Sequence, residues 1–244
     1  MIAPQESRLL AGGEYEYLCD GHLVPVSESW QLSRTERGFA MLSQRAIPLL
    51  SVVIVVRVHF SGAGMERCLL QWRSTISEES VATATFAASP EQGVYRYRPR
   101  GAPARSVAVG DAHCFPLLRV FVGGIIQALV AEGGSGRVLV PWIHDPTQET
   151  RLFEPEFSVR SVQYLGSSGS GNPQAEEGVE LDHFRYSGGQ YESGADYWLA
   201  NGLLHEYRWQ QRGANWVVRL KNLDGRWPGA ELWPSTRPAV NANQ

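Results

Sequence analysis

The stretch that decides the fold is residues 184–220, FRYSGGQYESGADYWLANGLLHEYRWQQRGANWVVRL, in which aromatic residues recur among ionisable ones. Asn201-Gly202 separates two alternating runs. This dipeptide is the strongest short-range signal for a β-hairpin, because both residues accept the positive φ of a type I′ turn. The stretch therefore predicts a hairpin within a mainly β protein.

The turn also predicts which residues of the hairpin face one another. If Ala200 faces Leu203, the pairs on one side of the sheet are Trp198 with His205, Asp196 with Tyr207, and Gly194 with Trp209. One face then combines two Trp, a Tyr, a His and an Asp, which is unusual both for a core and for an exposed surface. We predict that this face forms the wall of a pocket.

The composition is that of an ordinary globular chain. At 244 residues, the length fits a single β-rich domain over residues 1–244, since β-barrels and sandwiches often run to roughly 200–250 residues. A hydrophobic content of 43% supplies a core without disulfides. The net charge of −3 argues against a general nucleic-acid binder.

Three cysteines, Cys19, Cys68 and Cys114, lie far apart and lack the spacing of zinc ligands. We expect small buried hydrophobes in a reducing compartment, and no metal site. Residues 1–13 lack the basic start and apolar run of a signal peptide. The expected location is the cytoplasm, or the periplasm if an export signal has been removed.

The first part of the chain predicts an antiparallel meander, because alternating runs recur at regular spacing between turn signals. The expected strands are 14–20, 23–34, 39–46, 51–60, 65–75, 80–88 and 94–98. The run Val52–Val56 is apolar on both faces and must be covered on both sides. We expect a large curved antiparallel sheet or a half-open, lipocalin-like barrel.

The pattern changes after Cys114. From Phe115 to Ala131 the polar side chains are Arg119 and Gln127 alone, as on one narrow side of a helix. We predict an apolar helix, inserted at about 113–132, that packs over the sheet. A mobile lid and a membrane-surface element are the alternatives. The segment is too short for a membrane span, which needs about 20 apolar residues.

Two further segments carry few strand signals. A flexible loop is expected at 166–178, where Ser, Gly, Asn and Pro are concentrated. A C-terminal tail is expected at 225–244, with Trp227 and Trp233 docked on the rest of the chain and the last residues frayed.

Landmarks along most of the chain resemble those of uncharacterised bacterial β-rich proteins of the domain-of-unknown-function type, which have a lipocalin-like or LolA-like curved sheet. The landmarks are the Tyr-x-Tyr strand before Asp20-Gly21, the apolar helix before Val138–Ile143, and the Tyr197-Trp198…Asn201-Gly202-Leu203 hairpin before Trp216–Leu220. The resemblance implies a ligand-sized concavity under a curved sheet. It implies no catalytic residues.

Common catalytic and cofactor-binding signatures are missing: there is no G-x-S-x-G elbow, no G-x-G-x-x-G that opens a helix, no Walker loop and no H-E-x-x-H. We therefore expect no cofactor. His205 is the strongest candidate for acid–base chemistry, because in the predicted register it lies diagonal to Asp196, whose carboxylate would orient the imidazole. Tyr207 or Tyr186 would be a second proton donor. The alternative is that His205 and Asp196 merely satisfy each other on a half-buried sheet.

Six residues complete the predicted site as substrate-binding groups: Trp198, Trp209, Tyr186, Phe115, Phe121 and His144. The first hypothesis is a module that binds a small apolar or amphiphilic molecule between the sheet and the helix. The alternative is a cofactor-independent isomerase, lyase or hydrolase that acts on an apolar, terpenoid-like substrate in the same cavity. The third is a protein-interaction module, for example a homodimer that covers Trp198 and Trp209.

Overall fold

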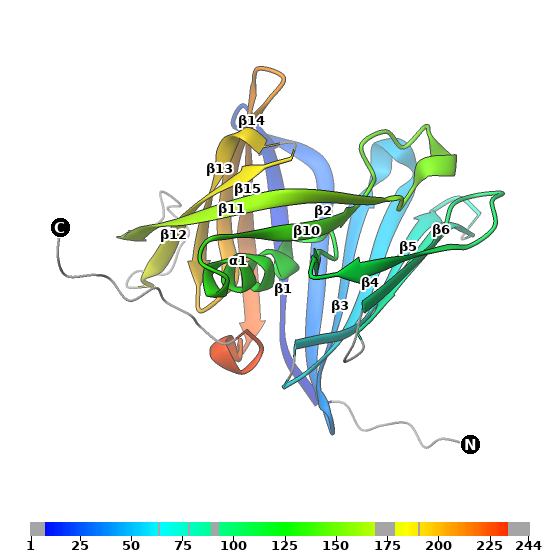
Figure 1. Cartoon of the computed structure of the whole chain (residues 1–244). Coiled ribbons are helices and arrows are strands. Elements are labelled where there is room, and N and C mark those ends of the chain that lie inside the picture. Colours follow the sequence, from blue (N-terminus) through cyan, green and yellow to red (C-terminus); the bar gives the residue numbers. More distant parts are fainter. Residues whose placement is uncertain are drawn as a thin grey trace.

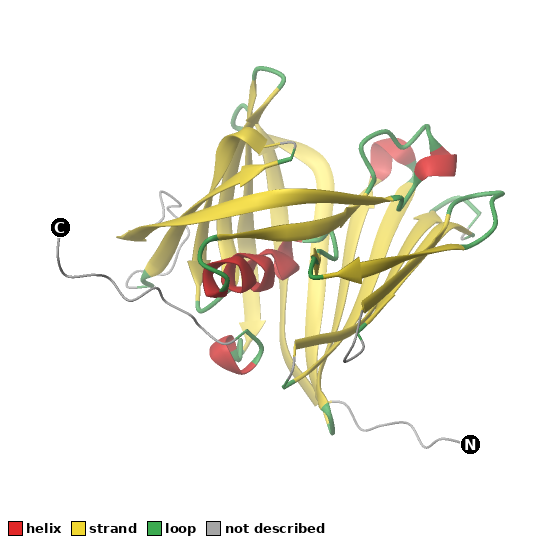
Figure 2. Ribbon diagram, in the orientation of Figure 1, coloured by secondary structure: helices red, strands yellow, loops and turns green. Residues whose placement is uncertain are grey.

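The computed structural model describes residues 8–62, 64–77, 79–88, 93–168, 179–189 and 191–233. In Figures 1 and 2 the chain forms a mainly β, barrel-like structure with a helix inside the curve of the sheet. The strands before the helix are β1 (Arg8–Cys19), β2 (His22–Thr35), β3 (Gly38–Ile47), β4 (Val52–Ser61), β5 (Gly64–Ser74), β6 (Ser80–Ala87), β7 (Gly93–Arg98), β8 (Arg105–Gly110) and β9 (His113–Cys114).

The remaining strands follow α1 (Val122–Ala131), the one α-helix among the residues that the structure describes. They are β10 (Ser135–Pro141), β11 (Pro155–Ser168), β12 (Leu181–Gly188), β13 (Tyr191–Ala200), β14 (Leu203–Gln211) and β15 (Ala214–Gly225). Four short 3-10 helices complete the described elements: η1 (Pro48–Leu50), η2 (Arg119–Phe121), η3 (Glu149–Arg151) and η4 (Gly229–Glu231).

All fifteen strands belong to one sheet, in the order β8-β7-β6-β5-β4-β3-β2-β1-β15-β14-β13-β12-β11-β10-β9. Pairing is antiparallel except between β9 and β10. The chain thus makes one meander from β1 to β8 and a second from β10 to β15, which returns to β1. The two edge strands, β8 and β9, are consecutive in the chain, so a short link brings the edges of the sheet together.

The predicted mainly β fold with a curved, barrel-like antiparallel sheet is confirmed. Turn chemistry explains much of it, since Asp20, Gly21, Asn201 and Gly202 all have positive φ at tight turns between neighbouring strands. Inward-pointing aromatic and aliphatic side chains alternate with outward polar ones along β1 to β7. This alternation fills the interior of the barrel.

The predicted helix is present, but it begins later in the sequence than predicted. Phe115 is extended and its N–H donates to the carbonyl of Leu139. Pro116 follows, and Leu117 has a φ of 67°. These residues interrupt any helix before Arg119, because proline donates no backbone hydrogen bond and the left-handed conformation cannot continue a helix.

The sequence left open which part of the sheet the helix covers. In the structure α1 packs chiefly against β10, β11 and β14. Figure 2 shows it within the curve of the C-terminal meander. The reason is a close backbone contact, since a Cβ on Gly123 would lie 1.7 Å from the carbonyl oxygen of Gly202. Only glycine lets the helix approach the β13–β14 turn this closely.

The predicted loop at 166–178 falls mostly outside the described residues, and so does the tail from 234 onward. Within the described part of the tail, docking of both tryptophans is confirmed. Trp227 and Trp233 contact each other with ring centroids 5.2 Å apart. The indole N–H of Trp227 donates to the carbonyl of Asn201 at 3.1 Å.

Candidate functional site

An apolar groove lies between α1 and the N-terminal meander. Its volume is about 460 Å³, within the usual range for small-molecule sites. Its lining residues are Phe60, Gly64, Met65, Phe86, Ala112, His113, Cys114, Pro116, Phe121, Gly124, Ile125, Gln127, Ala128, Ala131, Leu232 and Trp233. Hydrophobic side chains therefore dominate a concave surface of ligand size.

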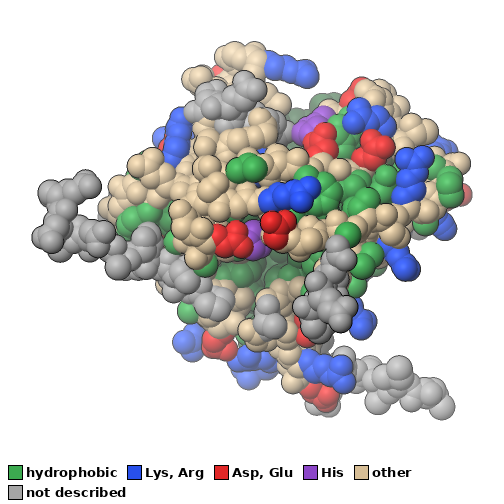
Figure 3. Space-filling model, in the orientation of Figure 1, with side chains coloured by type: hydrophobic (Ala, Val, Ile, Leu, Met, Phe, Trp, Pro, Cys, Tyr) green, Lys and Arg blue, Asp and Glu red, His purple; other side chains and the backbone are tan. Residues whose placement is uncertain are grey.

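Few polar side chains line this groove; they are His113 and Gln127. In Figure 3 hydrophobic side chains occupy a hollow on the visible face, with acidic side chains and a histidine beside it. His113 Nε2 lies 2.9 Å from a carboxylate oxygen of Glu132, and Arg137 lies 3.7 Å from Asp111. A molecule with an apolar body and one polar end matches this distribution.

Close contacts with glycine and tryptophan fix one wall of the groove. A Cβ on Gly124 would lie 2.4 Å from the indole nitrogen of Trp233, so this ring rests directly on the helix backbone. Trp233 also meets Phe60 edge to face at 6.1 Å. The C-terminal tryptophan thereby connects α1 to β4 across the groove.

A row of aromatic rings crosses the inner face of β12 to β15. Neighbouring centroids are 5.6 Å apart for Tyr186 and Tyr197, 4.4 Å for Tyr197 and Tyr207, 4.3 Å for Tyr207 and Trp209, and 5.5 Å for Trp209 and Trp216. The guanidinium of Arg119 lies 4.7 Å from the Tyr207 centroid. Arg160 lies 5.9 Å from that of Tyr186. Cations therefore flank the row, as cation–π contacts favour.

A second, smaller cavity of about 40 Å³ lies between this row and α1. Its lining residues are Phe115, Arg119, Val122, Ile125, Ile126, Val140, Arg160, Tyr186 and Tyr197. Ile125 lines both cavities. The helix therefore separates an apolar groove on one side from an arginine-containing pocket on the other.

A buried ionic network lies next to these arginines. Glu28 accepts hydrogen bonds from the hydroxyl of Tyr17 at 2.6 Å and from Nε of Arg45 at 2.9 Å. Its other oxygen accepts the backbone N–H of Arg119 at 2.5 Å. The Glu28 side chain has no exposed surface. Burial raises the pKa of Tyr17 well above its ordinary value; the positive charge of Arg45 opposes this shift, and the negative charge of Glu28 adds to it.

The structure separates the predicted acid–base residues because the predicted register is wrong beyond Leu199 and Leu204. A β-bulge makes His205 an extra residue, so Trp198 faces Glu206, Tyr197 faces Tyr207, and Asp196 faces Arg208. Asp196 lies on the outer face, where His183 bonds to it at 3.0 Å and Arg185 forms an ion pair with it. Tyr207 is fully buried on the inner face. The geometric basis for a site of Asp196, His205 and Tyr207 is therefore missing.

The six predicted binding residues are divided among several places. Phe121 lines the apolar groove, whereas Phe115 and Tyr186 line the smaller pocket. Trp209 belongs to the inner aromatic row. Trp198 lies on the opposite face of the sheet, where it stacks on His183 at 4.5 Å and Arg208 covers it. Trp198 and Trp209 therefore lie on opposite faces of the sheet and do not form one surface.

His144 lies outside both cavities. Its Nε2 is 3.0 Å from a carboxylate oxygen of Glu156, and both side chains are exposed. The nearby Asp145 accepts hydrogen bonds from the Thr147 hydroxyl and backbone N–H and from the Gln148 amide. These bonds lower the pKa of Asp145. The His-Asp-Pro segment therefore forms an exposed turn.

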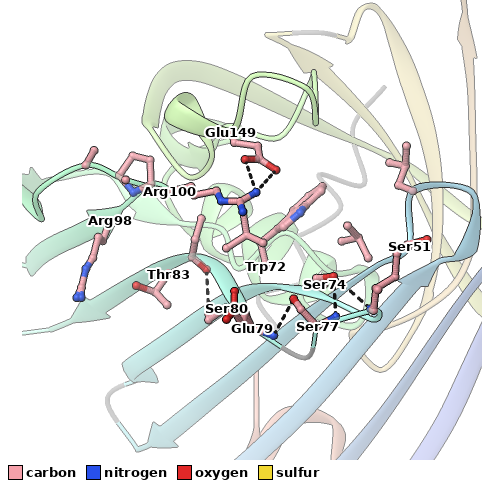
Figure 4. Close-up of a pocket in the computed structure, with 18 residues that line it drawn as sticks. Ser51, Trp72, Ser74, Ser77, Glu79, Ser80, Thr83, Arg98, Arg100 and Glu149 are labelled. Carbon is pink, nitrogen blue, oxygen red and sulfur yellow. Dashed lines mark hydrogen bonds and ion pairs between the residues drawn. The ribbon is translucent and has the colours of Figure 1, made fainter.

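A larger cavity of about 610 Å³ lies where the β4–β5–β6 strands meet the η3 segment (Figure 4). Many of its polar groups already form hydrogen bonds or ion pairs with neighbouring residues. The hydroxyl of Ser74 accepts the backbone N–H groups of Ile76 and Ser77, and Arg100 donates to both oxygens of Glu149. The lining of this cavity is mainly polar, unlike that of the groove beside α1.

Two of the three cysteines are buried and provide a test of the interior. Burial raises the pKa of Cys114 to about 12 and that of Cys68 well above 9.0. Only Cys19 among the described residues is a partly exposed thiol. We expect a thiol-specific reagent at pH 8 to label Cys19 in the native protein and all three cysteines in urea. Equal labelling rates for all three in the native protein would contradict this packing.

The same shifts predict how stability depends on pH. A thiol whose pKa is higher in the folded protein contributes stability that is complete below the unfolded value of about 9 and is lost as the pH rises toward 12. Buried Tyr15 and Tyr95 act in the same direction. The free energy of unfolding should therefore fall from pH 8 to pH 11, and a Cys68→Ala, Cys114→Ala variant should lose less over this interval.

Among the residues that the structure describes, no group of three or more His, Cys, Asp or Glu could hold a metal ion. No helix in the described ranges combines the length and hydrophobicity required to span a membrane.

The sequence analysis did not identify the buried charged residues Glu28, Arg45 and Arg160. Their inward positions on strands are the signal that could have identified them.

Comparison with known proteins identifies similarity to solved structures. No protein-family model and no curated protein match the chain. Among solved structures, the chain is similar to a beta-barrel-like protein of a domain of unknown function, DUF1849, from Brucella abortus. The TM-score is 0.54 at 8% sequence identity, and the match covers 89% of this chain and 98% of the other. At this identity the likeness concerns the fold alone, and it supports the uncharacterised β-rich, barrel-like class that the sequence resembles.

Proposed function

We propose that the protein binds a small apolar or amphiphilic molecule in the groove between α1 and the N-terminal meander. The observation that carries the proposal is a preformed concavity of about 460 Å³ with a hydrophobic lining. Apolar surface of this extent releases water when a ligand covers it, which favours binding. The His113–Glu132 pair at the rim suits a single polar end.

The groove can be closed by one substitution. Ala128 lines it from α1 and is partly exposed, so Ala128→Phe would place a ring in the space a ligand needs. We expect this variant to bind the neutral fluorescent probe N-phenyl-1-naphthylamine at least 10-fold more weakly than the parent protein. Fluorescence titration measures the effect.

The matched control is Ala87→Phe. Ala87 is exposed on β6, next to the groove-lining Phe86 but on the outer face of the sheet. Probe affinity should be unchanged in this variant. If the probe does not bind the parent protein, or if both variants bind it as well as the parent does, the groove is not a ligand site.

A further inference from the structure

We infer that the polar cavity of Figure 4 is a separate binding site for a neutral mono- or disaccharide. Its volume of about 610 Å³ lies within the usual range for small-molecule sites. It shares no lining residue with the groove beside α1. The two cavities lie at opposite ends of the β4–β5 pair, where Val52 faces Ser74 at one end and Phe60 faces Met65 near the other. The inference therefore does not depend on a ligand in the groove.

The lining of this cavity carries no net charge. Its ionisable side chains are Arg98, Arg100, Glu79 and Glu149, so two positive charges balance two negative ones. Nη1 of Arg100 donates to both carboxylate oxygens of Glu149, at 3.1 and 2.9 Å, and each side chain thereby holds the other in place. A net anion or cation gains no net attraction from a balanced lining, whereas a neutral polar ligand can use each charged group as a strong hydrogen-bond partner.

The lining offers both donors and acceptors of hydrogen bonds. Within the described part of the chain, the hydroxyls of Ser51 and Thr83 form no hydrogen bond and Arg98 forms no ion pair. The Ser74 hydroxyl accepts two backbone N–H groups and still has a proton to donate. A sugar hydroxyl is a donor and an acceptor at once, so the several hydroxyls of one ring can use groups of both kinds.

Trp72 supplies a further donor on the inner side of the cavity. The residue is 3% exposed, and in Figure 4 its side chain points from β5 into the middle of the labelled group. Its indole nitrogen belongs to the part that stays accessible, and the N–H donates to no group among the described residues. A largely buried indole N–H usually has a hydrogen-bond partner. A ligand oxygen in the cavity would supply one.

Apolar side chains at the mouth match the C–H faces of a sugar ring. Ile76 is 81% exposed and Leu50 is 45% exposed, and both line the cavity. The turns that carry them are joined by a hydrogen bond of 2.9 Å from the N–H of Thr75 to the carbonyl of Ser51. A ring that covers these side chains removes apolar surface from water while its hydroxyls pair with the polar groups. Neither a hydrocarbon nor an ion satisfies both parts of the lining.

The test measures binding of the methyl glycosides of glucose, galactose, mannose and N-acetylglucosamine by NMR and calorimetric titration. At least one of them should bind with millimolar affinity. Tetrahydropyran-2-methanol keeps the ring but lacks the ring hydroxyls, and should bind at least 10-fold more weakly. The indole N–H resonance of Trp72, identified by its absence from the spectrum of Trp72→Phe, should shift during the titration. Failure of all the glycosides to bind, or equal binding of tetrahydropyran-2-methanol, would overturn the inference.

Matched substitutions on β6 and β7 locate the site even if Trp72→Phe does not fold. Thr83 and Arg98 face each other and line the cavity, whereas Thr85 and Arg96 face each other further along the same strands and do not line it. All these side chains are at least partly exposed. Thr83→Val and Arg98→Gln should each weaken glycoside binding at least fivefold, and Thr85→Val and Arg96→Gln should leave it within twofold. Equal effects of the two pairs, or no effect of either, would refute a site in this cavity.

Discussion

Replacing Gly123 with alanine is expected to lower the free energy of unfolding by about 3 kcal/mol or more. The added Cβ would meet the carbonyl oxygen of Gly202 at 1.7 Å, and the backbone fixes the positions of both atoms. The better helix propensity of alanine, about 1 kcal/mol in a helix interior, is smaller than the strain. Urea unfolding followed by far-UV circular dichroism measures the loss.

The neighbouring glycine provides the control. A Cβ on Gly124 would meet the indole of Trp233 at 2.4 Å, but a side chain can move where a backbone cannot. Gly124→Ala should therefore lose less than half as much stability as Gly123→Ala, and should change the tryptophan emission spectrum. Equal losses in the two variants would show that the contact with the β13–β14 turn does not hold α1 in place.

Replacing Glu28 with alanine is expected to destabilise the protein by about 3–5 kcal/mol, because the change leaves the guanidinium of Arg45 buried without its carboxylate. The pair is 2.8 Å apart, and the two side chains are 8% and 0% exposed. The Tyr17 hydroxyl and the N–H of Arg119 lose an acceptor in the same step. Equilibrium unfolding in urea gives the difference.

Two comparisons separate this effect from the loss of any acidic residue. Glu14→Ala breaks an exposed ion pair with Lys221 and should change stability by less than about 1 kcal/mol. A Glu28→Met, Arg45→Met double variant should be more stable than Glu28→Met alone, because it removes both buried charges. If Glu28→Ala were no more harmful than Glu14→Ala, the buried network would not stabilise the interior.

Local signals in the sequence predicted much of the fold. The turns at Asp20-Gly21 and Asn201-Gly202 depend on positive φ, which few residues adopt, and alternation of polar and apolar residues identified the strands. The first pairs beside the Asn201-Gly202 turn have the predicted partners. These features rest on contacts between near neighbours in the chain.

The register of the candidate site could not be predicted from the same signals. One extra residue, His205, moves every later side chain of β14 to the opposite face relative to β13. Tyr207 therefore joins the inner aromatic row, and Asp196 joins the outer ion pairs. The alternating sequence around His205 gives no sign of a bulge.

Long-range packing explains the other differences. The position of α1 depends on Gly202 and Trp233, which lie far from the helix in the sequence. The Glu28–Arg45 pair could have been predicted from the sequence, because both residues occupy inward positions in the β2–β3 hairpin and face each other there. A charged residue at an inward strand position is a signal for a buried partner.

The most direct test of ligand binding in the groove is the position of a ligand in a crystal. A crystal of the parent protein grown with 8-bromo-1-octanol, measured at the bromine absorption edge, should show anomalous density between Phe121, Met65 and Trp233, which line the groove. Crystals of Ala128→Phe should show none there. Bromine density confined to other surfaces of the parent protein, or equal density in the groove of the variant, would contradict the proposed binding site.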